Sequence, residues 1–368
     1  MNVTSTGLRS LIGELCGIAA PSGNEDRMIA RVRDELTAAG LRPHVDRIGN
    51  VTATIGSGAP ELLLFAHLDQ LGLTVRAVEP QGFIRVERLG GVPERVLPGL
   101  RVTIHGAAGE VPAVVGLKAH HLTPPEEKYV ARPVTDLYLD AGFASAEEAA
   151  AAGVRAGDPV TYESRVVELA NGRLAGTSMD DRVAVAALLQ LLPRLVASPP
   201  RSTVHLVFSV QEEFNVRGTL ALAARLQPAV AVQVDVAPAA DTPDLHGFTP
   251  VRLGGGPVLT RLSFHGRGTL GGMVPHPAVL ASLERAALAT GVQVQRQAIV
   301  GLVTDAAFLP MATGEGIACA EVAIPVRYTH SPVETVQLSD VEATVELLEE
   351  FIRSAYDLDL TRGREVVR

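Results

Sequence analysis

The sequence predicts an α/β fold in which a mostly parallel sheet is covered by helices and a small β-rich domain is inserted. Two apolar runs, at 204–210 and 229–238, have the composition of buried strands, and a helical pattern lies between them. Over 73–165 the pattern changes to short strand-like runs separated by Gly and Pro. Because strand–helix alternation precedes and follows this stretch, we expect residues 1–72 and 166–368 to form one larger domain around the insertion.

The composition limits what this protein can be. Its 368 residues, 47% of them hydrophobic, suffice for one large and one smaller packed domain. The formal net charge of −9, without a dense Lys/Arg cluster, predicts no nucleic-acid partner and no membrane partner. No apolar run reaches the roughly 20 residues that span a bilayer. Cys16 and Cys319 form no CxxC pattern, which argues against a disulfide framework and fits a cytoplasmic location.

Local patterns predict the individual elements. Leu11, Ile12 and Leu15 have helical spacing and indicate a first helix rather than a signal peptide. Ser22 and Glu25 have the spacing of a capping box and predict the start of a second helix. The further strands are expected at 43–55, 62–65, 292–300 and from 317, and the further helices at 145–153, 183–196, up to 225, at 276–290 and at 339–356.

Metal-ligand residue types follow the predicted strands of the larger domain or lie just beyond them. They are His67, Asp69, Asp180, Asp181, Glu212, Glu213, Asp235 and His330. Ligands of open α/β sheets bind beyond the carboxyl ends of the strands, so these side chains are candidates for one site. Imidazole and carboxylate without thiolate are typical of a catalytic divalent metal site, most often zinc, and a bridging carboxylate can hold two metals.

Spacing within the pairs suggests different tasks. His67 and Asp69 are two apart on an extended chain, so Asp69 can lie beside the imidazole and fix its tautomer. Glu212 and Glu213 face opposite sides if the strand geometry persists, so that one can bind metal while the other acts as a base. Taken alone, the Glu pair fits equally well with a solvated helix start, because Glu is favoured in a first helical turn.

Seven motifs occur in an order that resembles a known family. They are AHLDQLG, DDR, QEEFNVRG, VDVAPAADTP, LGGGP, TDA and RYTHSPVE. This series is similar to that of the dinuclear-metal aminopeptidases that assemble into tetrahedral (TET) particles, a glutamyl/leucyl aminopeptidase-like family of which some members were labelled endoglucanases. The resemblance covers nearly the whole chain, including the insertion.

The resemblance implies a role for each candidate residue. His67 and Asp235 would be ligands of one metal ion and Glu213 and His330 of the other, with Asp180 as the bridge in preference to Asp181. Glu212 would be the general base and Asp69 the orienting acid. The implied cofactors are two divalent metal ions, with zinc expected first and cobalt or manganese as alternatives. The family also has an often cis peptide after the bridging Asp, here at Asp180–Asp181.

The function expected from this resemblance is removal of N-terminal residues from short peptides. It further implies a homo-oligomer, in which dimers formed through the inserted domain assemble into dodecamers. A serine hydrolase fits poorly because the sequence contains no GxSxG elbow. Two alternatives stay open: a related metal-dependent deacylase or carboxypeptidase-like amidohydrolase, and a non-catalytic peptide-binding protein that kept the fold.

Overall fold

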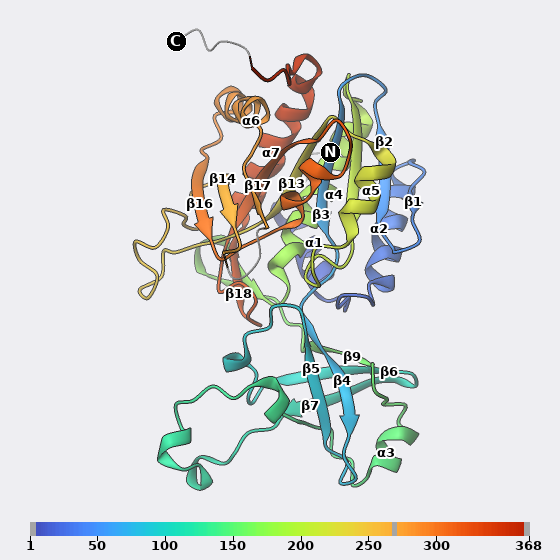
Figure 1. The fold of residues 1–368 in the computed structure, drawn as a ribbon, viewed down its shortest axis with the longest axis vertical. Coiled ribbons are helices and arrows are strands. Elements are labelled where there is room, and N and C mark those ends of the chain that lie inside the picture. Colours follow the sequence, from blue (N-terminus) through green and yellow to red (C-terminus); the bar gives the residue numbers. More distant parts are fainter. Residues whose placement is uncertain (1–4, 267–270, 364–368) are drawn as a thin grey trace.

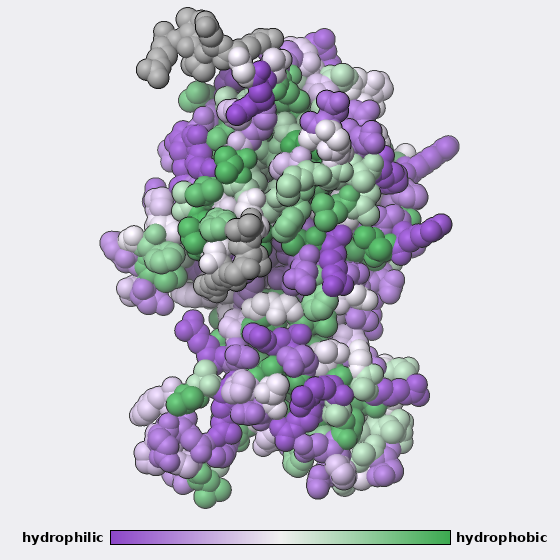
Figure 2. All heavy atoms as spheres, viewed as in Figure 1, coloured by the Kyte–Doolittle hydropathy of each residue, from purple (hydrophilic) through white to green (hydrophobic). Residues whose placement is uncertain are grey.

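The structure is a computed structural model that describes residues 5–266 and 271–363 and consists of two parts. The larger part combines a sheet with helices, and the smaller part is a barrel of strands joined to one end of it (Figure 1). The molecule narrows where the two parts meet (Figure 2). Among the described helices, none combines the length and the apolar character needed to cross a bilayer.

The described residues of the larger part contain a 12-stranded sheet with four neighbouring parallel strands at its centre. In spatial order these are β12 (Thr203–Ser209), β3 (Glu61–His67), β13 (Val230–Pro238) and β17 (Ala318–Arg327). The other strands are β1 (His44–Val45), β2 (Val51–Ile55), β10 (Val167–Leu169), β11 (Arg173–Gly176), β14 (Val258–Phe264), β15 (Gly272–Met273), β16 (Gln295–Val300) and β18 (Glu334–Gln337). Antiparallel pairs flank the parallel centre, so the predicted α/β class is confirmed and the sheet is mixed.

Helices cover both faces of the sheet because its central strands are apolar on both sides. Leu62 and Leu64 of β3 pack into the main core, whereas Leu63 and Phe65 pack into a second core on the opposite face. The main core contains residues of α1 (Ser5–Cys16), α2 (Asp26–Ala38), α4 (Met179–Ala197), α6 (Pro277–Thr290) and α7 (Leu338–Ser354). The second core contains residues of α5 (Gly218–Leu226).

The smaller part is a closed antiparallel barrel with its own hydrophobic core. Its strands, in the order in which they pair, are β4 (Gly72–Val78), β5 (Ile84–Leu89), β8 (Leu139–Asp140), β7 (Gly109–Val115), β6 (Arg101–Gly106) and β9 (Pro159–Tyr162). Closure leaves no unpaired sheet edge, which lets short strands form a stable unit. The predicted short helix is α3 (Ala146–Ala151).

The capping-box prediction was wrong, and the strand geometry does not persist to the Glu pair. Ser22 and Glu25 form no capping box, because Ser22 Oγ donates to Asp69 Oδ2 (2.6 Å) and Glu25 Oε1 accepts from the Gly23 amide (2.8 Å). The strand geometry also stops short of the Glu pair: β12 ends at Ser209, and Gln211 has a φ of 58°. In both places a tertiary contact or a turn outweighs the local pattern.

Candidate metal centre

His67 is the last residue of β3, and its imidazole is only 2% exposed. Its Nδ1 lies 3.1 Å from the carbonyl oxygen of Asp69, which can only accept a hydrogen bond. Nδ1 therefore carries the proton, and Nε2 faces the carboxylate of Asp180 at 3.1 Å. With Nδ1 held as the donor to this carbonyl, Nε2 is the nitrogen that would bind a metal ion once the proton it donates to Asp180 is displaced. The Asp69 carboxylate is farther from Nδ1, at 3.4 Å.

Asp69 also organises the loop that carries the Glu pair. Its side chain is fully buried, and its two oxygens accept the backbone N–H groups of Glu212 (2.9 Å) and Glu213 (3.0 Å). Burial acts to raise the pKa of Asp69, but hydrogen bonds from His67 and Ser22 outweigh burial and lower it. The charged carboxylate of Asp69 thus fixes the backbone positions of both glutamates, which follow the end of β12.

Asp180 and Asp181 lie at the start of α4 and have non-helical backbone angles. The peptide between them is cis, as the resemblance implies. Asp180 faces both candidate imidazoles, with Oδ1 at 3.1 Å from His67 Nε2 and Oδ2 at 3.6 Å from His330 Nε2. Asp181 Oδ2 instead accepts the His67 backbone N–H (3.2 Å). Asp180 is therefore the residue of this pair that faces both imidazoles.

Asp235 lies near the end of β13 and is 4% exposed. Its Oδ2 accepts a hydrogen bond from Gln233 Nε2 (2.6 Å), and its Oδ1 accepts from the Val236 amide (2.6 Å). Gln233 is held in turn by the Ala306 amide, which donates to its Oε1 (2.6 Å). The carboxylate of Asp235 is thereby oriented from within the sheet.

His330 follows β17 in a turn with a φ of 68°. Its Nδ1 donates to the carbonyl oxygen of Gly91 (3.0 Å), a residue that follows β5 of the barrel. Its Nε2 lies 3.8 Å from Glu213 Oε2, and its side chain is 37% exposed. The barrel thus fixes the tautomer of an imidazole in the larger part.

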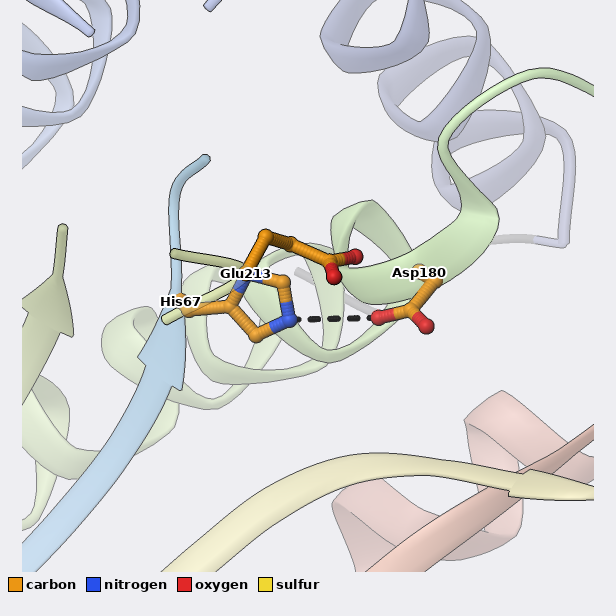
Figure 3. Close-up of side chains that lie close together, drawn as sticks. All are labelled: His67, Asp180 and Glu213. Atoms are coloured by element: carbon orange, nitrogen blue, oxygen red, sulfur yellow. Dashed lines mark hydrogen bonds and ion pairs between the residues drawn. The ribbon is translucent and has the colours of Figure 1, made fainter. Parts of the chain in front are cut away.

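The candidate donors meet in two overlapping groups in the described residues. His67, Asp180 and Glu213 offer ligand atoms that lie within 4.8 Å of one another (Figure 3), and so do His67, Asp181 and Asp235. His330 belongs to neither group, although it lies beside Asp180 and Glu213. Glu212 also stands outside both groups. The second group contains Asp181 where the resemblance implies Asp180.

Sequence reasoning assigned no role to Glu334, which ties two of these residues together. Its Oε2 accepts the Asp180 amide (3.1 Å) and its Oε1 accepts the His330 amide (2.6 Å). Glu334 is 2% exposed and belongs to the RYTHSPVE motif. The motif contained this single carboxylate, but its spacing from His330 does not indicate that it accepts both backbone N–H groups.

Burial disfavours the charged forms of Glu212, Glu213 and Asp235. Burial, followed by the Asp180 carboxylate, raises the pKa of Glu213 to about 8 and that of Asp235 to about 7. Burial also raises the pKa of Glu212 well above its ordinary value, with the charges of Asp235 and Asp305 adding to the shift. So many buried carboxylates with few cations near them are destabilising unless positive charge is supplied.

The residues present fit divalent cations. Glu213 Oε1 and Asp181 Oδ1 are buried and have no hydrogen-bond partner within residues 5–266 and 271–363. Asp180, Glu213 and His330 line one small cavity. Unpartnered buried carboxylate oxygens close to imidazole nitrogens fit a divalent metal ion.

An open α/β sheet whose strand ends deliver imidazole and carboxylate donors to one buried cluster defines the class of metal-dependent hydrolases. Within this class the chain belongs to the M42 glutamyl aminopeptidase family, whose sequence model matches residues 49–347. The resemblance to the TET-type aminopeptidases is thereby confirmed. The protein is an aminopeptidase of the M42 metallopeptidase family, which decides against the deacylase and the non-catalytic alternatives.

Individual relatives agree with this assignment. The chain is 37% identical to the SgcX protein of Escherichia coli strain K12 over 332 residues, which are 89% of either chain. Aminopeptidase APDkam598 from the archaeon Desulfurococcus kamchatkensis has a TM-score of 0.89 at 33% identity, covering 95% of this chain and 96% of that one. The TET1 peptidase of Pyrococcus horikoshii, which can assemble into a tetrahedron or a large octahedral shell, has a TM-score of 0.83 at 27% identity and coverages of 94% and 99%.

Proposed function

We propose that this aminopeptidase removes N-terminal residues from short peptides with two divalent metal ions and Glu212 as general base. His67 and Asp235 would hold one ion, Glu213 and His330 the other, and Asp180 both. The observation that carries the proposal is the convergence of these donors, with which the Glu212 carboxylate interacts electrostatically. We propose zinc as the native metal, with cobalt or manganese as alternatives.

When bound, the metal ions would lower the pKa of a water molecule toward neutrality and polarise the scissile carbonyl. Glu212 accepts the proton of that water and returns it to the leaving amine. Asp69 holds the backbone of Glu212 in place.

Replacing the base tests this mechanism directly. Glu212→Gln should retain two metal ions, measured by elemental analysis, but hydrolyse an aminoacyl chromogenic substrate about 10²- to 10⁴-fold more slowly. Glu346→Gln, an exposed position on α7, is the matched control and should behave like the unmodified enzyme. Full activity of Glu212→Gln would refute the assignment, and loss of metal would make Glu212 a ligand instead.

We further propose that residues 73–165 form a dimerisation and lid domain and that dimers assemble into a tetrahedral dodecamer. The loop between β7 and β8 supports this because it exposes large apolar side chains. They are Leu117 (62%), Leu122 (79%), Tyr129 (96%) and Val130 (64%). The tetrahedron of the similar TET1 peptidase also supports the assembly. Light scattering that gives the mass of a single chain would refute it.

A further inference from the structure

Tyr162 belongs to the barrel but faces the metal centre. It is the last residue of β9, and its side chain is 7% exposed. It lines the same small cavity as Asp180, Glu213 and His330, all of which come from the larger part. Tyr162 is thus a side chain of the barrel that reaches the candidate ligands.

The hydroxyl group of Tyr162 is buried and has no hydrogen-bond partner among the residues that the structure describes. Buried hydroxyl groups in folded proteins almost always have one, so an unpaired one requires an explanation. A phenol has an ordinary pKa of about 10, so at neutral pH this group keeps its proton and offers a donor. The Tyr162 hydroxyl group is therefore a hydrogen-bond donor in this cavity that lacks an acceptor.

The neighbouring carboxylates do not provide that acceptor. Both oxygens of Glu334 already accept backbone N–H groups, from Asp180 and His330. Glu213 Oε1 is itself without a partner, so the phenol does not reach it. The space open between these groups, about 10 Å³, matches about one small oxygen-centred group. An acceptor oxygen that enters this cavity would satisfy the phenol.

We propose that Tyr162 is a catalytic residue that donates a hydrogen bond to the scissile carbonyl oxygen as that oxygen gains negative charge. This inference rests on the proposed function. As the water oxygen adds to the carbonyl carbon, the π electron pair of the carbonyl moves to its oxygen, which accepts the bond from Tyr162. When the C–N bond breaks, that pair re-forms the carbonyl and the nitrogen leaves with the proton that Glu212 returns. Tyr162 keeps its own proton throughout.

Because Tyr162 belongs to the barrel, the reaction rate would depend on how the barrel packs against the larger part. A hydrogen bond that strengthens only as charge develops raises kcat rather than lowering KM. The barrel thus takes part in the reaction itself in addition to holding His330 through Gly91.

The test is Tyr162→Phe, which removes one oxygen atom and keeps the ring. We expect kcat for an aminoacyl chromogenic substrate to fall about 10²-fold, with KM within about twofold. An aminophosphonate analogue of the tetrahedral species should bind about 10²-fold more weakly, whereas binding of the free amino acid product should change little. Metal content and thermal midpoint should match those of the unmodified enzyme. Tyr138→Phe is the matched control, because this barrel tyrosine packs against Phe83 (ring centroids 5.1 Å apart) and does not line the cavity.

Each other outcome overturns the proposal. Unchanged kcat would show that the hydroxyl has no part in the reaction. Equal loss of analogue and product affinity would make Tyr162 a general binding residue. Loss of metal would make it a positioning residue for Glu213 or His330. Failure of the unmodified enzyme to hydrolyse the substrate would instead refute the proposed function, so the two failures are distinguishable.

Discussion

The two halves of the candidate metal centre are built in different ways. His67 and Asp235 extend from neighbouring parallel strands, are 2% and 4% exposed, and are oriented by groups of the larger part. Glu213 and His330 lie on turns after the strands, and the imidazole of His330 is 37% exposed and bonded to the barrel. The first half is fixed by the sheet, whereas the second is fixed by the junction between the two parts. A change in the barrel should therefore affect the second half first.

The largest effect on metal affinity is expected from a change at the junction between the barrel and the larger part. A Cβ atom added at Gly91 would lie 2.9 Å from His330 Nδ1, so Gly91→Ala must displace the imidazole from the Gly91 carbonyl. We expect the affinity for one of the two metal ions to fall about 10- to 100-fold, the usual effect of losing a group that orients a ligand. Metal titration by calorimetry measures it.

The control for that change is Gly314→Ala, because a Cβ atom there would meet nothing within 4 Å. It should bind both ions as the unmodified protein does. If Gly91→Ala weakened both ions equally, the proposed division of the centre into two halves would be wrong.

A smaller effect on metal affinity is expected from a substitution within the sheet. Gln233→Leu removes the donor to Asp235 Oδ2 and the acceptor of the Ala306 amide. We expect the affinity of the other ion to fall about 10-fold, and the unpaired amide to cost about 1–3 kcal/mol of stability. Calorimetric titration measures the first effect and denaturant unfolding the second.

Gln297→Leu provides a matched comparison for this substitution. Gln297 is also a buried glutamine of the same sheet, but it donates to Thr260 Oγ1 (3.0 Å) rather than to a candidate ligand. Gln297→Leu should lower the free energy of unfolding without changing the affinity for either metal ion. Equal loss of metal in the two variants would mean that Gln233 acts through the packing of the sheet and not through Asp235.

The strand-end residues were predictable because each follows an apolar run that can only be a buried strand. His67, Asp235 and the Glu pair follow such runs, and parallel strands bring their carboxyl ends to one edge. The fold class followed from the same runs. This part of the site is encoded locally, and the order of the motifs provided the rest of the expected ligand set.

The groups that the sequence did not reveal depend on tertiary contacts. Tyr162 ends an ordinary barrel strand, and Gly91 lies in a connection, so nothing local links them to His330. Ser22 and Glu25 show the opposite case, because their spacing matches a capping box while contacts with Asp69 and the Gln211 amide decide their conformation. The predicted helix does begin here, as α2, but the spacing predicts a capping box only where no distant partner competes.

The smallest effect concerns pH and appears in the metal-free protein. Burial raises the pKa of Glu213 from 4.5 to about 8 and that of Asp235 from 3.8 to about 7, so between these values the folded protein binds more protons than the unfolded chain. Stability must then fall as pH rises through that window. For His330, burial acts to lower the pKa, but the Glu213 and Asp180 charges raise it from 6.5 to about 9, so its stabilising charge is likewise lost with rising pH. This contribution is reduced by solvent screening, since the imidazole is 37% exposed.

Bound metal ions displace these protons, so the metal-loaded protein should lack the effect. We expect the gap in thermal midpoint between loaded and stripped protein to widen by at least about 3 °C from roughly pH 5 to roughly pH 8, which corresponds to about 2 kcal/mol for a chain of this size. Differential scanning fluorimetry of both forms across this range measures it. A gap that stays constant or narrows would mean that these carboxylates are not the groups that the metal ions neutralise. Repeating the measurement with Gly91→Ala should reduce the widening, because only the half held by the sheet would then bind its ion at full affinity.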